Sequence, residues 1–318
     1  MKNFISKVKR KIWSEIVKRT LNTPIYYYLY KSYWNFLFRK GCKLDSNNFY
    51  FTARPNPGAG IGHQMANWIA GYWFAKQFKI RFAHIPFSSE KWENFLGFGA
   101  QEVLVDTLTK EGYKKIRLPL FDENKPEEIE LIKKIISSYS GQKIVFVCEQ
   151  DQFYKNQYGI LEDIQNKFYQ AESRKNDQLI YDTHHYNIAI HIRRGDIVIG
   201  QENKNPNLLM RYQDNDYFYN TLSYTLKEIV KTDKKIVIHL FSQGIEKDFE
   251  EFKDFPNVQF CLDMNAQDSF LHMVYADCLI TSKSSFSYKP ALLNKGIKVC
   301  PEDFWHGYPN TLDWVLID

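Results

Sequence analysis

The sequence predicts an α/β protein with two domains, the second of which holds a doubly wound parallel sheet. The chain has 318 residues, of which 44% are hydrophobic, so it is too long for one small core. Between residues 186 and 301, short apolar runs alternate with segments of helical periodicity at a regular interval. Strands separated by helices in this way are typical of a parallel sheet with helices on both faces.

Residues 1–48 are predicted to form a basic arm that precedes both domains. Residues 1–40 carry ten Lys and Arg against one acidic residue, Glu15, which gives +9 and leaves −4 for the remainder of a chain whose total is +5. Because the positive charge is confined to the arm, we expect no nucleic-acid partner. No apolar run is long enough to span a bilayer, and the apolar core of a signal peptide is missing. We therefore expect a cytoplasmic protein, either free or peripheral on the inner face of the membrane.

The arm itself has the pattern of an amphipathic helix followed by an aromatic stretch, "IYYYLYKSYWNFLF". Two interpretations of this pattern stay open. In the first, residues 1–40 lie on an anionic membrane surface. In the second, they form an ordinary helix that packs on the domain with its basic face in solvent. The apolar residues that share one helical face are Ile5, Val8, Ile12 and Ile16.

The N-terminal domain is predicted to span residues 49–184. It opens with a loop rich in glycine and proline, and from Gln64 the apolar pattern turns helical through Phe78. A glycine-rich loop that enters a helix N-terminus is an anion site, although its spacing fits neither a P-loop nor GxGxxG. The other predicted elements are strands at 80–85 and 143–148, a helix at 127–138, and a helix with a linker within 161–180.

The C-terminal domain is predicted to span residues 185–318. Its strands are expected at 186–192, 235–242, 258–263, 278–282 and 297–301. The helices between them are expected at 216–231, 245–253, 267–276 and 285–293.

No metal site is predicted. The "DND" at Asp214–Asp216 resembles a metal-binding DxD motif, but it opens a helix instead of ending an apolar strand, so an N-cap is the simpler interpretation. The five cysteines show no CxxC spacing, which indicates a reducing compartment. Four of them lie in apolar, strand-like runs and are expected in the core: Cys148, Cys261, Cys278 and Cys300.

The stretch "IAIHIRRGD", residues 188–196, places two arginines directly after a buried strand. In open α/β sheets, ligands bind at the carboxyl ends of the strands. Two planar guanidinium groups followed by a glycine suit a phosphate better than an ammonium group would. We therefore predict a phosphate site at Arg193 and Arg194.

Three segments together resemble the α1,2-, α1,6- and protein O-fucosyltransferases: "GAGIGHQM", "HIRRGD" and "ADCLITSKSSFSYKPALLN". The bacterial α1,2-type glycosyltransferases are the most similar group. The resemblance covers roughly residues 56–305 and is sharp only in these three segments. It implies a GT-B-like fold of two Rossmann-like domains, with the C-terminal one binding the nucleotide sugar. It also implies an inverting hexosyltransferase that needs no metal or cofactor beyond its GDP-sugar donor.

The resemblance further implies roles for individual residues of the second domain. Arg193 would contact the β-phosphate, and Arg194 would support the same charge or order the loop. His191 would approach the nucleotide, Asp196 would orient the arginines or the acceptor, and Asp268 would read the guanine edge. Ser284, Ser285 and Phe286 would surround the diphosphate at the start of the last helix.

In the first domain, the residues implied to face the sugar and acceptor are Gly60, Gly62, His63 and Gln64. The base that activates the acceptor hydroxyl is left open among Asp196, Glu202 and His63. Two departures from the α1,2-type pattern lie near the expected sugar site. His63 replaces an asparagine, and Tyr288–Lys289 replaces a pair of tryptophans.

The expected reaction is transfer of fucose, or of a related sugar, from its GDP donor to a hydroxyl of a glycan acceptor. The setting would be bacterial surface polysaccharide biosynthesis, such as capsule, lipopolysaccharide or O-antigen. One alternative is a heptosyltransferase-like GT-B enzyme with another nucleotide sugar. A second alternative is a non-catalytic, membrane-associated subunit of polysaccharide assembly, although such a protein would be expected to lose Arg193 or the "SSFS" segment.

Overall fold

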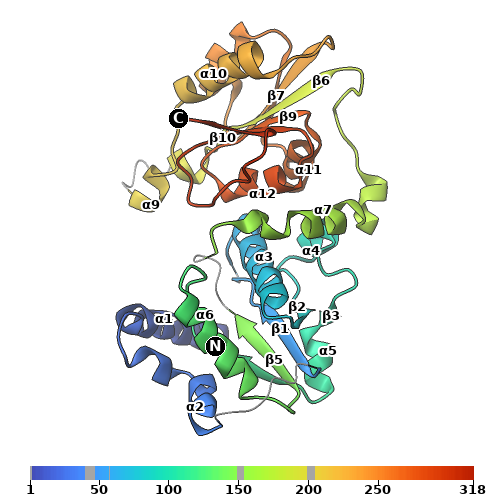
Figure 1. Cartoon of the computed structure of the whole chain (residues 1–318). Coiled ribbons are helices and arrows are strands. Elements are labelled where there is room, and N and C mark those ends of the chain that lie inside the picture. The colour runs from blue at the N-terminus through green and yellow to red at the C-terminus, as the bar shows by residue number, and fades with distance from the viewer. Residues whose placement is uncertain (1, 40–46, 57, 149–153, 199–204) are drawn as a thin grey trace. The chain divides into compact units, whose positions relative to one another are not determined.

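The computed structural model describes residues 2–39, 47–56, 58–148, 154–198 and 205–318. Their contacts group the chain into two compact units, whose elements are drawn in Figure 1. The N-terminal unit comprises Met1–Arg54, Ala70–Ile85 and Glu102–Tyr154, and the C-terminal unit comprises Pro55–Ile69, Pro86–Gln101 and Lys155–Asp318. The glycine-rich loop thus belongs to the C-terminal unit. The division into an arm, residues 1–48, and domains of 49–184 and 185–318 stays a prediction.

The C-terminal unit contains a six-stranded parallel sheet in the order β11-β10-β9-β6-β7-β8. Counted along the chain, this is the 3-2-1-4-5-6 order of a Rossmann fold, which confirms the predicted doubly wound sheet. The strand order reverses between β6 and β9, and ligands of such sheets bind at this switch point. The strands are β6 (Tyr186–His191), β7 (Ile236–Ser242), β8 (Val258–Leu262), β9 (Cys278–Ile280), β10 (Ile297–Pro301) and β11 (Trp314–Ile317), of which β11 was not predicted.

The helices of this sheet largely follow the predicted pattern. They are α9 (Pro206–Leu209), α10 (Asn215–Tyr224) with the π-turn η4 (Thr225–Ile229), α11 (Ala266–Tyr275) and α12 (Ser285–Leu293). The predicted helix at 245–253 is present as 3-10 helix. Residues Glu246–Asp254 form the 3-10 segment η5, which is interrupted by non-helical backbone at Phe249. Phe249 and Phe252 are both fully buried and anchor this segment in the core.

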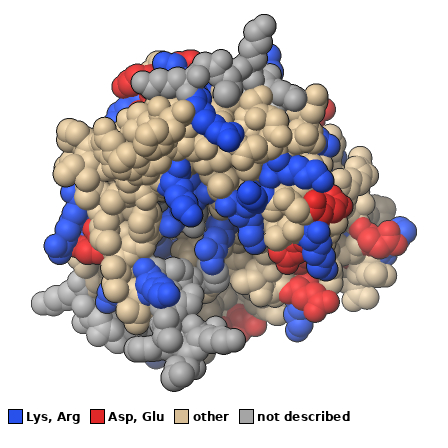
Figure 2. All heavy atoms as spheres, turned by 90° about the horizontal axis from the view of Figure 1, so that it is seen from below, with Lys and Arg blue, Asp and Glu red and all other residues tan. Residues whose placement is uncertain are grey.

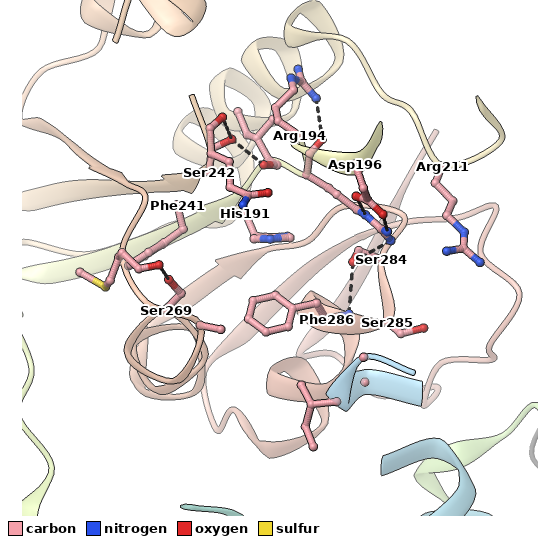
Figure 3. Close-up of a pocket in the computed structure, with 18 of the residues that line it drawn as sticks. His191, Arg194, Asp196, Arg211, Phe241, Ser242, Ser269, Ser284, Ser285 and Phe286 are labelled. Atoms are coloured by element: carbon pink, nitrogen blue, oxygen red, sulfur yellow. Dashed lines mark hydrogen bonds and ion pairs between the residues drawn. The ribbon is translucent and has the colours of Figure 1, made fainter. Parts of the chain in front are cut away.

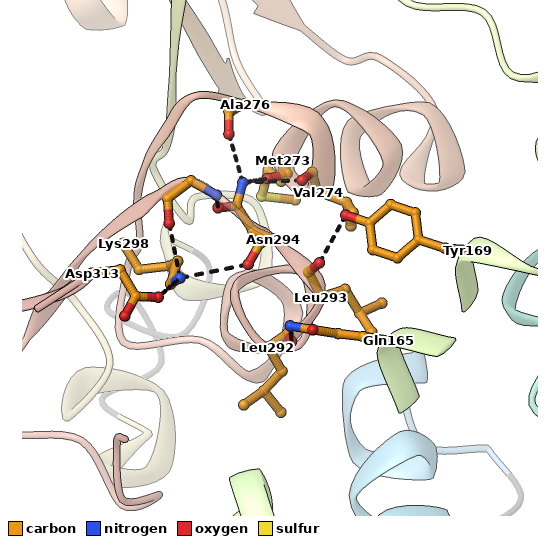
Figure 4. Close-up of polar contacts among 11 residues, drawn as sticks. Gln165, Tyr169, Met273, Val274, Ala276, Leu292, Leu293, Asn294, Lys298 and Asp313 are labelled. Carbon is orange, nitrogen blue, oxygen red and sulfur yellow. Dashed lines mark hydrogen bonds and ion pairs between the residues drawn. The ribbon is translucent and has the colours of Figure 1, made fainter. Parts of the chain in front are cut away.

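Buried polar contacts hold α12 at its C-terminal end (Figure 4). The Asn294 amide donates to the backbone carbonyls of Met273, Val274 and Ala276, at 2.8–3.0 Å. These bonds satisfy carbonyls at the end of α11, which would otherwise lose water without gaining a partner. The last turn of α12 also accepts bonds from helix α7 (Leu161–Tyr169), from Gln165 to Leu292 and from Tyr169 to Leu293. Helix α12 is therefore a fixed platform.

The remaining helical segments of the C-terminal unit surround α7. They are η2 (Gln157–Ile160), η3 (Glu172–Asn176) and α4 (Glu90–Leu96). The Arg174 guanidinium lies over the rings of Phe168 and Phe95, at 4.1 and 4.5 Å from their centroids. It also pairs with Asp177 at 3.3 Å, so this buried charge is compensated.

The N-terminal unit is built on a second parallel sheet, in the order β3-β2-β1-β5-β4. Its strands are β1 (Phe49–Ala53), β2 (Arg81–His84), β3 (Val103–Leu104), β4 (Lys114–Arg117) and β5 (Ile144–Cys148). Its helices include α5 (Val105–Lys110) and α6 (Pro126–Ser137), and α3 (Ile61–Gln77) enters it at Ala70. The class is therefore the expected one, α/β with two units of parallel sheet. Helix α3 begins three residues before the predicted Gln64.

The basic arm forms α1 (Lys2–Thr20), η1 (Tyr26–Leu29) and α2 (Lys31–Phe38) and belongs to the N-terminal unit. Trp13 packs edge-on against Tyr30, with ring centroids 5.6 Å apart, and the Arg117 guanidinium lies over the Trp13 ring at 4.5 Å. Tyr26 and Tyr30 are buried, and the Leu120 amide donates to the Tyr26 hydroxyl. The arm therefore packs on the unit, as the second interpretation held.

The packed side of α1 is not the predicted apolar stripe, however. Val8, Ile12 and Ile16 are 42%, 55% and 39% exposed, whereas Trp13 and Val17 face the unit.

No helix within the described ranges is long and apolar enough to cross a bilayer. On the face drawn in Figure 2, lysine and arginine side chains gather near the middle and carboxylates lie mainly toward the rim. Cys148, Cys261, Cys278 and Cys300 are buried, as predicted.

Candidate functional site

A pocket of about 440 Å³ lies in the C-terminal unit, where β6, β7 and β9 end. Its wall combines the segment after β6, the end of β7, the start of α11, the start of α12 and the beginning of α3 (Figure 3). Ten of the thirteen predicted site residues line it: Gly60, Gly62, His63, His191, Arg193, Arg194, Asp196, Ser284, Ser285 and Phe286. Residues separated by more than 200 positions in the sequence therefore meet at the switch point of the sheet.

Arg193 is held at the mouth of the pocket by an ion pair. Its Nη2 donates to Oδ2 of Asp196 at 2.8 Å, and its Nη1 lies 3.4 Å from the Ser284 hydroxyl. The Arg193 side chain is 20% exposed and that of Asp196 is 59% exposed. Gly195 makes the turn between them with a φ of +63°, and a Cβ there would meet the Gln243 side chain at 2.0 Å. Glycine is favoured at this position because most other residues rarely adopt a positive φ.

Arg194 has a different role, because its guanidinium turns away from the pocket interior (Figure 3). Its Nη1 donates to the carbonyls of Arg193 and Gln213, each at 3.0 Å, and its Nη2 donates to the Asn215 side chain. The guanidinium also lies over the Tyr212 ring, 5.2 Å from its centroid. Arg194 thus ties the loop after β6 to the start of α10.

The N-terminus of α12 forms the opposite wall. Ser284 is the N-cap residue, and its hydroxyl accepts from the Phe286 amide at 3.2 Å. Gly62 approaches this turn so closely that a Cβ on it would lie 2.7 Å from the Ser285 carbonyl oxygen. The first amides of a helix carry partial positive charge and have no partner within the helix. Arg193 and α12 therefore present positive charge and donors to the same space.

His191 forms part of the floor and is neutral near pH 7. Burial, with a smaller contribution from the charge of Arg193, lowers the pKa of His191 to about 3. Its Nδ1 lies 2.9 Å from the Ser282 hydroxyl, and its ring centroid is 5.5 Å from that of Phe286. A neutral ring offers one donor and one acceptor and adds no charge to the pocket.

Three predicted site residues are placed differently. Gln64 is buried but does not line the pocket. Its amide nitrogen donates to the Ala59 carbonyl and the Ser88 hydroxyl, and its carbonyl accepts from the Ser88 amide. It therefore fastens the glycine-rich loop. Asp268 is exposed in the first turn of α11, bonded to Asn265, while the lining includes its neighbours Ala266 and Ser269. Glu202 lies outside the described residues.

The sequence analysis missed several lining residues. Arg211 had no signal, because it stands in an irregular segment between two helices. The lining residues at the ends of β7 and β8 did have a sequence signal, because the carboxyl ends of neighbouring parallel strands lie at the same edge of the sheet. The missed residues are Ile61, Ile192, Arg211, Phe241, Ser242, Gln243, Met264, Ala266 and Ser269.

The DND segment has the expected structural role. The Asp214 carboxylate accepts from the Tyr217 amide at 2.9 Å and caps α10. Across the described ranges, no three His, Cys, Asp or Glu side chains are grouped so as to hold a metal ion.

The charges of the pocket decide what it can bind. In the described part of the chain, its lining contains three arginines and one carboxylate, that of Asp196. Arg193 and the first turn of α12 face the same space, so a group with two or more negative charges is the ligand best matched to it.

No protein-family model matches the sequence, and no curated protein is significantly similar to it. Among solved structures, the chain is similar to POFUT1 in complex with GDP, with a TM-score of 0.48 and 12% identity over 81% of this chain and 99% of that one. It is also similar to fucosyltransferase NodZ from Bradyrhizobium, with a TM-score of 0.45 and 12% identity over 79% of this chain and 94% of that one. A third is an arginine-to-lysine variant of Arabidopsis thaliana FUT1 in complex with GDP, with a TM-score of 0.45 and 10% identity over 93% of this chain and 79% of that one. These structural neighbours are fucosyltransferases.

Proposed function

We propose that the protein is an inverting glycosyltransferase that moves fucose, or a related sugar, from its GDP donor to a hydroxyl of a surface polysaccharide. The reaction would need no metal. The observation that carries this proposal is the placement of Arg193 beside the first turn of α12, inside the pocket at the sheet's switch point. The motif resemblance supplies the sugar and the nucleotide.

The chemistry explains why these groups are needed. As the glycosidic bond breaks, its electron pair leaves with the diphosphate, which gains negative charge. A guanidinium group and helix amides that are fixed before the reaction stabilise this charge without reorganising. Helix α12, held by Asn294 at one end and capped by Ser284 at the other, keeps its amides in place.

The acceptor hydroxyl must lose its proton as it attacks. Asp196 and His63, both in the lining, are the described candidates for this role, with Glu202 as a third. The Asp196 carboxylate is held by Arg193 at 2.8 Å, so it is positioned by the same cation that would bind the phosphate.

A nucleotide panel tests the proposal. The full chain is titrated with GDP, ADP, UDP and GMP in the presence of a chelator, and its melting temperature is recorded. GDP should stabilise it most, and GDP-fucose should then be hydrolysed slowly or transferred to an acceptor without added metal. Preference for ADP would favour the heptosyltransferase-like alternative. Binding and turnover that require Mn²⁺ would contradict the mechanism.

We also propose that the enzyme attaches to anionic membranes through α1 and α2. Two observations support this partner. Val8, Ile12 and Ile16 form an exposed apolar stripe flanked by Lys9 and Lys11. Large apolar side chains of the following segment are exposed as well: Ile25, Tyr28, Trp34 and Phe38. An apolar stripe between cations, with aromatic residues beside it, matches the boundary between acyl chains and anionic headgroups.

Because the arm packs on its unit, point substitutions test this better than a deletion. Ile12→Glu with Ile16→Glu should abolish sedimentation with phosphatidylglycerol-containing vesicles, whereas Ile180→Glu, at an exposed apolar residue elsewhere, should leave it unchanged. Vesicles of phosphatidylcholine alone should bind neither the unmodified protein nor the variants. If the double variant instead binds vesicles as the unmodified protein does but no longer associates with itself, a second copy of the chain covers the stripe and the membrane proposal is wrong.

A further inference from the structure

The pocket contains a cation that neither the motif nor the resemblance indicates. Arg211 follows α9 and lies in the pocket lining together with Arg193. Its Nε is buried and has no hydrogen-bond partner within the described part of the chain. A buried guanidinium nitrogen without a partner is unfavourable, so such a group in a native pocket calls for an explanation.

The surroundings of Arg211 fix its side chain but do not neutralise it. The guanidinium lies over the Trp305 ring, 4.8 Å from its centroid, and Trp305 packs against Phe304 at 4.1 Å. Arg193 and Arg211 line the same pocket. Burial and then the charge of Arg193 lower the pKa of Arg211, and the charge of Asp196 opposes this shift. The one carboxylate of the lining is already paired with Arg193.

Arg194 does not supply the second positive charge of the pocket interior, and Arg211 is placed to do so. Figure 3 shows Arg211 extending beside Asp196 toward the level of Ser284, whereas Arg194 points away from Ser284. The bonds of Arg194 go to two backbone carbonyls and to Asn215. The second arginine of the motif is therefore committed to the loop, and the site lacks a second cation unless Arg211 supplies it.

We propose that Arg211 is a diphosphate-binding residue that acts with Arg193 as the second cation of the pocket. Two neighbouring guanidinium groups repel each other until an anion lies between them, so the pocket favours ligands with two adjacent phosphates over those with one. Trp305 is a positioning residue, because it holds the guanidinium by its ring face. This inference deepens the proposed function, on which it rests for the identity of the nucleotide.

Inorganic pyrophosphate is the probe that tests Arg211 without assuming a base or a sugar. Its affinity is measured by titration calorimetry for the full chain and for Arg211→Gln, at fixed ionic strength. We expect a loss of roughly tenfold to a hundredfold, as for one charge-assisted hydrogen bond. Lys247→Gln, which removes an exposed positive charge of the same unit away from the pocket, should change the affinity by less than about twofold.

Two further measurements sharpen the test. Arg211→Gln should weaken GDP more than GMP, because the second phosphate loses its partner. Trp305→Leu, which keeps the charge but removes the ring beneath it, should weaken pyrophosphate by about threefold to tenfold. If Arg211→Gln does not fold, this variant carries the test alone.

The outcomes separate the inference from the proposed function. Pyrophosphate affinities of Arg211→Gln and Trp305→Leu equal to that of the unmodified chain overturn the role of Arg211, even if GDP binds tightly. A chain that binds no pyrophosphate at all overturns it too. Pyrophosphate binding that depends on Arg211, together with no preference for GDP over ADP or UDP, supports the inference while contradicting the proposed nucleotide.

Discussion

Two adjacent arginines, Arg193 and Arg194, should respond to substitution in opposite ways. In Arg193→Ala, the lost contacts are a part-exposed ion pair with Asp196 and a 3.4 Å contact with Ser284. Part-exposed ion pairs contribute about 0–1 kcal/mol, so the free energy of unfolding should change little. Turnover should fall much further, because a preorganised donor to developing charge contributes about 3–4 kcal/mol, or roughly 10² to 10³ in rate.

Arg194→Lys should instead lower stability. An ammonium group cannot reach Gln213, Asn215 and the backbone carbonyl of Arg193 together, as the planar fork does. Leaving buried carbonyls without their charged donor should lower the free energy of unfolding by about 1.5–3 kcal/mol. Turnover measured well below the melting temperature should be reduced less than in Arg193→Ala.

The assay combines turnover of GDP-fucose, by transfer or slow hydrolysis, with urea unfolding of each variant. Arg193→Lys is the matched control that keeps the positive charge but lacks the planar pair of guanidinium donors, and its turnover should be little higher than that of Arg193→Ala. Near-normal turnover of Arg193→Ala would refute the phosphate role of this residue, and with it the proposed function. An Arg194→Lys variant that is fully stable but inactive would show that Arg194 contacts the ligand.

Three further predictions concern the frame of the site. Gly62→Ala should lower the unfolding free energy by about 1–3 kcal/mol, because its Cβ would overlap the Ser285 carbonyl, whereas Gly60→Ala, with open space around it, should not. Asp214→Ala should lower it by about 0.5–2 kcal/mol through loss of the α10 cap, and added Mn²⁺ should not shift the melting temperature of the unmodified chain. Burial lowers the pKa of His191 to about 3, of His239 to about 4 and of His306 to about 2. As pH falls below about 6.5, only the unfolded chain therefore takes up protons at these residues. The free energy of unfolding should drop by roughly 3–4 kcal/mol between about pH 7 and 5.5, and by about a third less in His191→Gln. An unfolding free energy that does not change over this range would contradict the neutral state of the three histidines.

The local features of this protein are determined by its sequence. The alternation of apolar strands and helices predicts the Rossmann-like sheet because hydrophobic periodicity acts over a few residues. The two arginines after β6 and the capping serine of α12 are recognisable for the same reason, since strand ends and helix caps are local. Asp214 could be assigned as an N-cap from its neighbours alone.

Only the tertiary structure decided which of these side chains line the pocket. Arg194 turns to Gln213, and Gln64 turns to Ser88, because each satisfies a backbone group of a segment that is distant in sequence. Arg211 reaches the pocket because Trp305, 94 positions later, lies beneath it. Ile12 is likewise exposed because helix α1 packs on its unit through Trp13 and not through the apolar stripe. Contacts of this kind depend on how elements dock, and no local pattern of residue types records that.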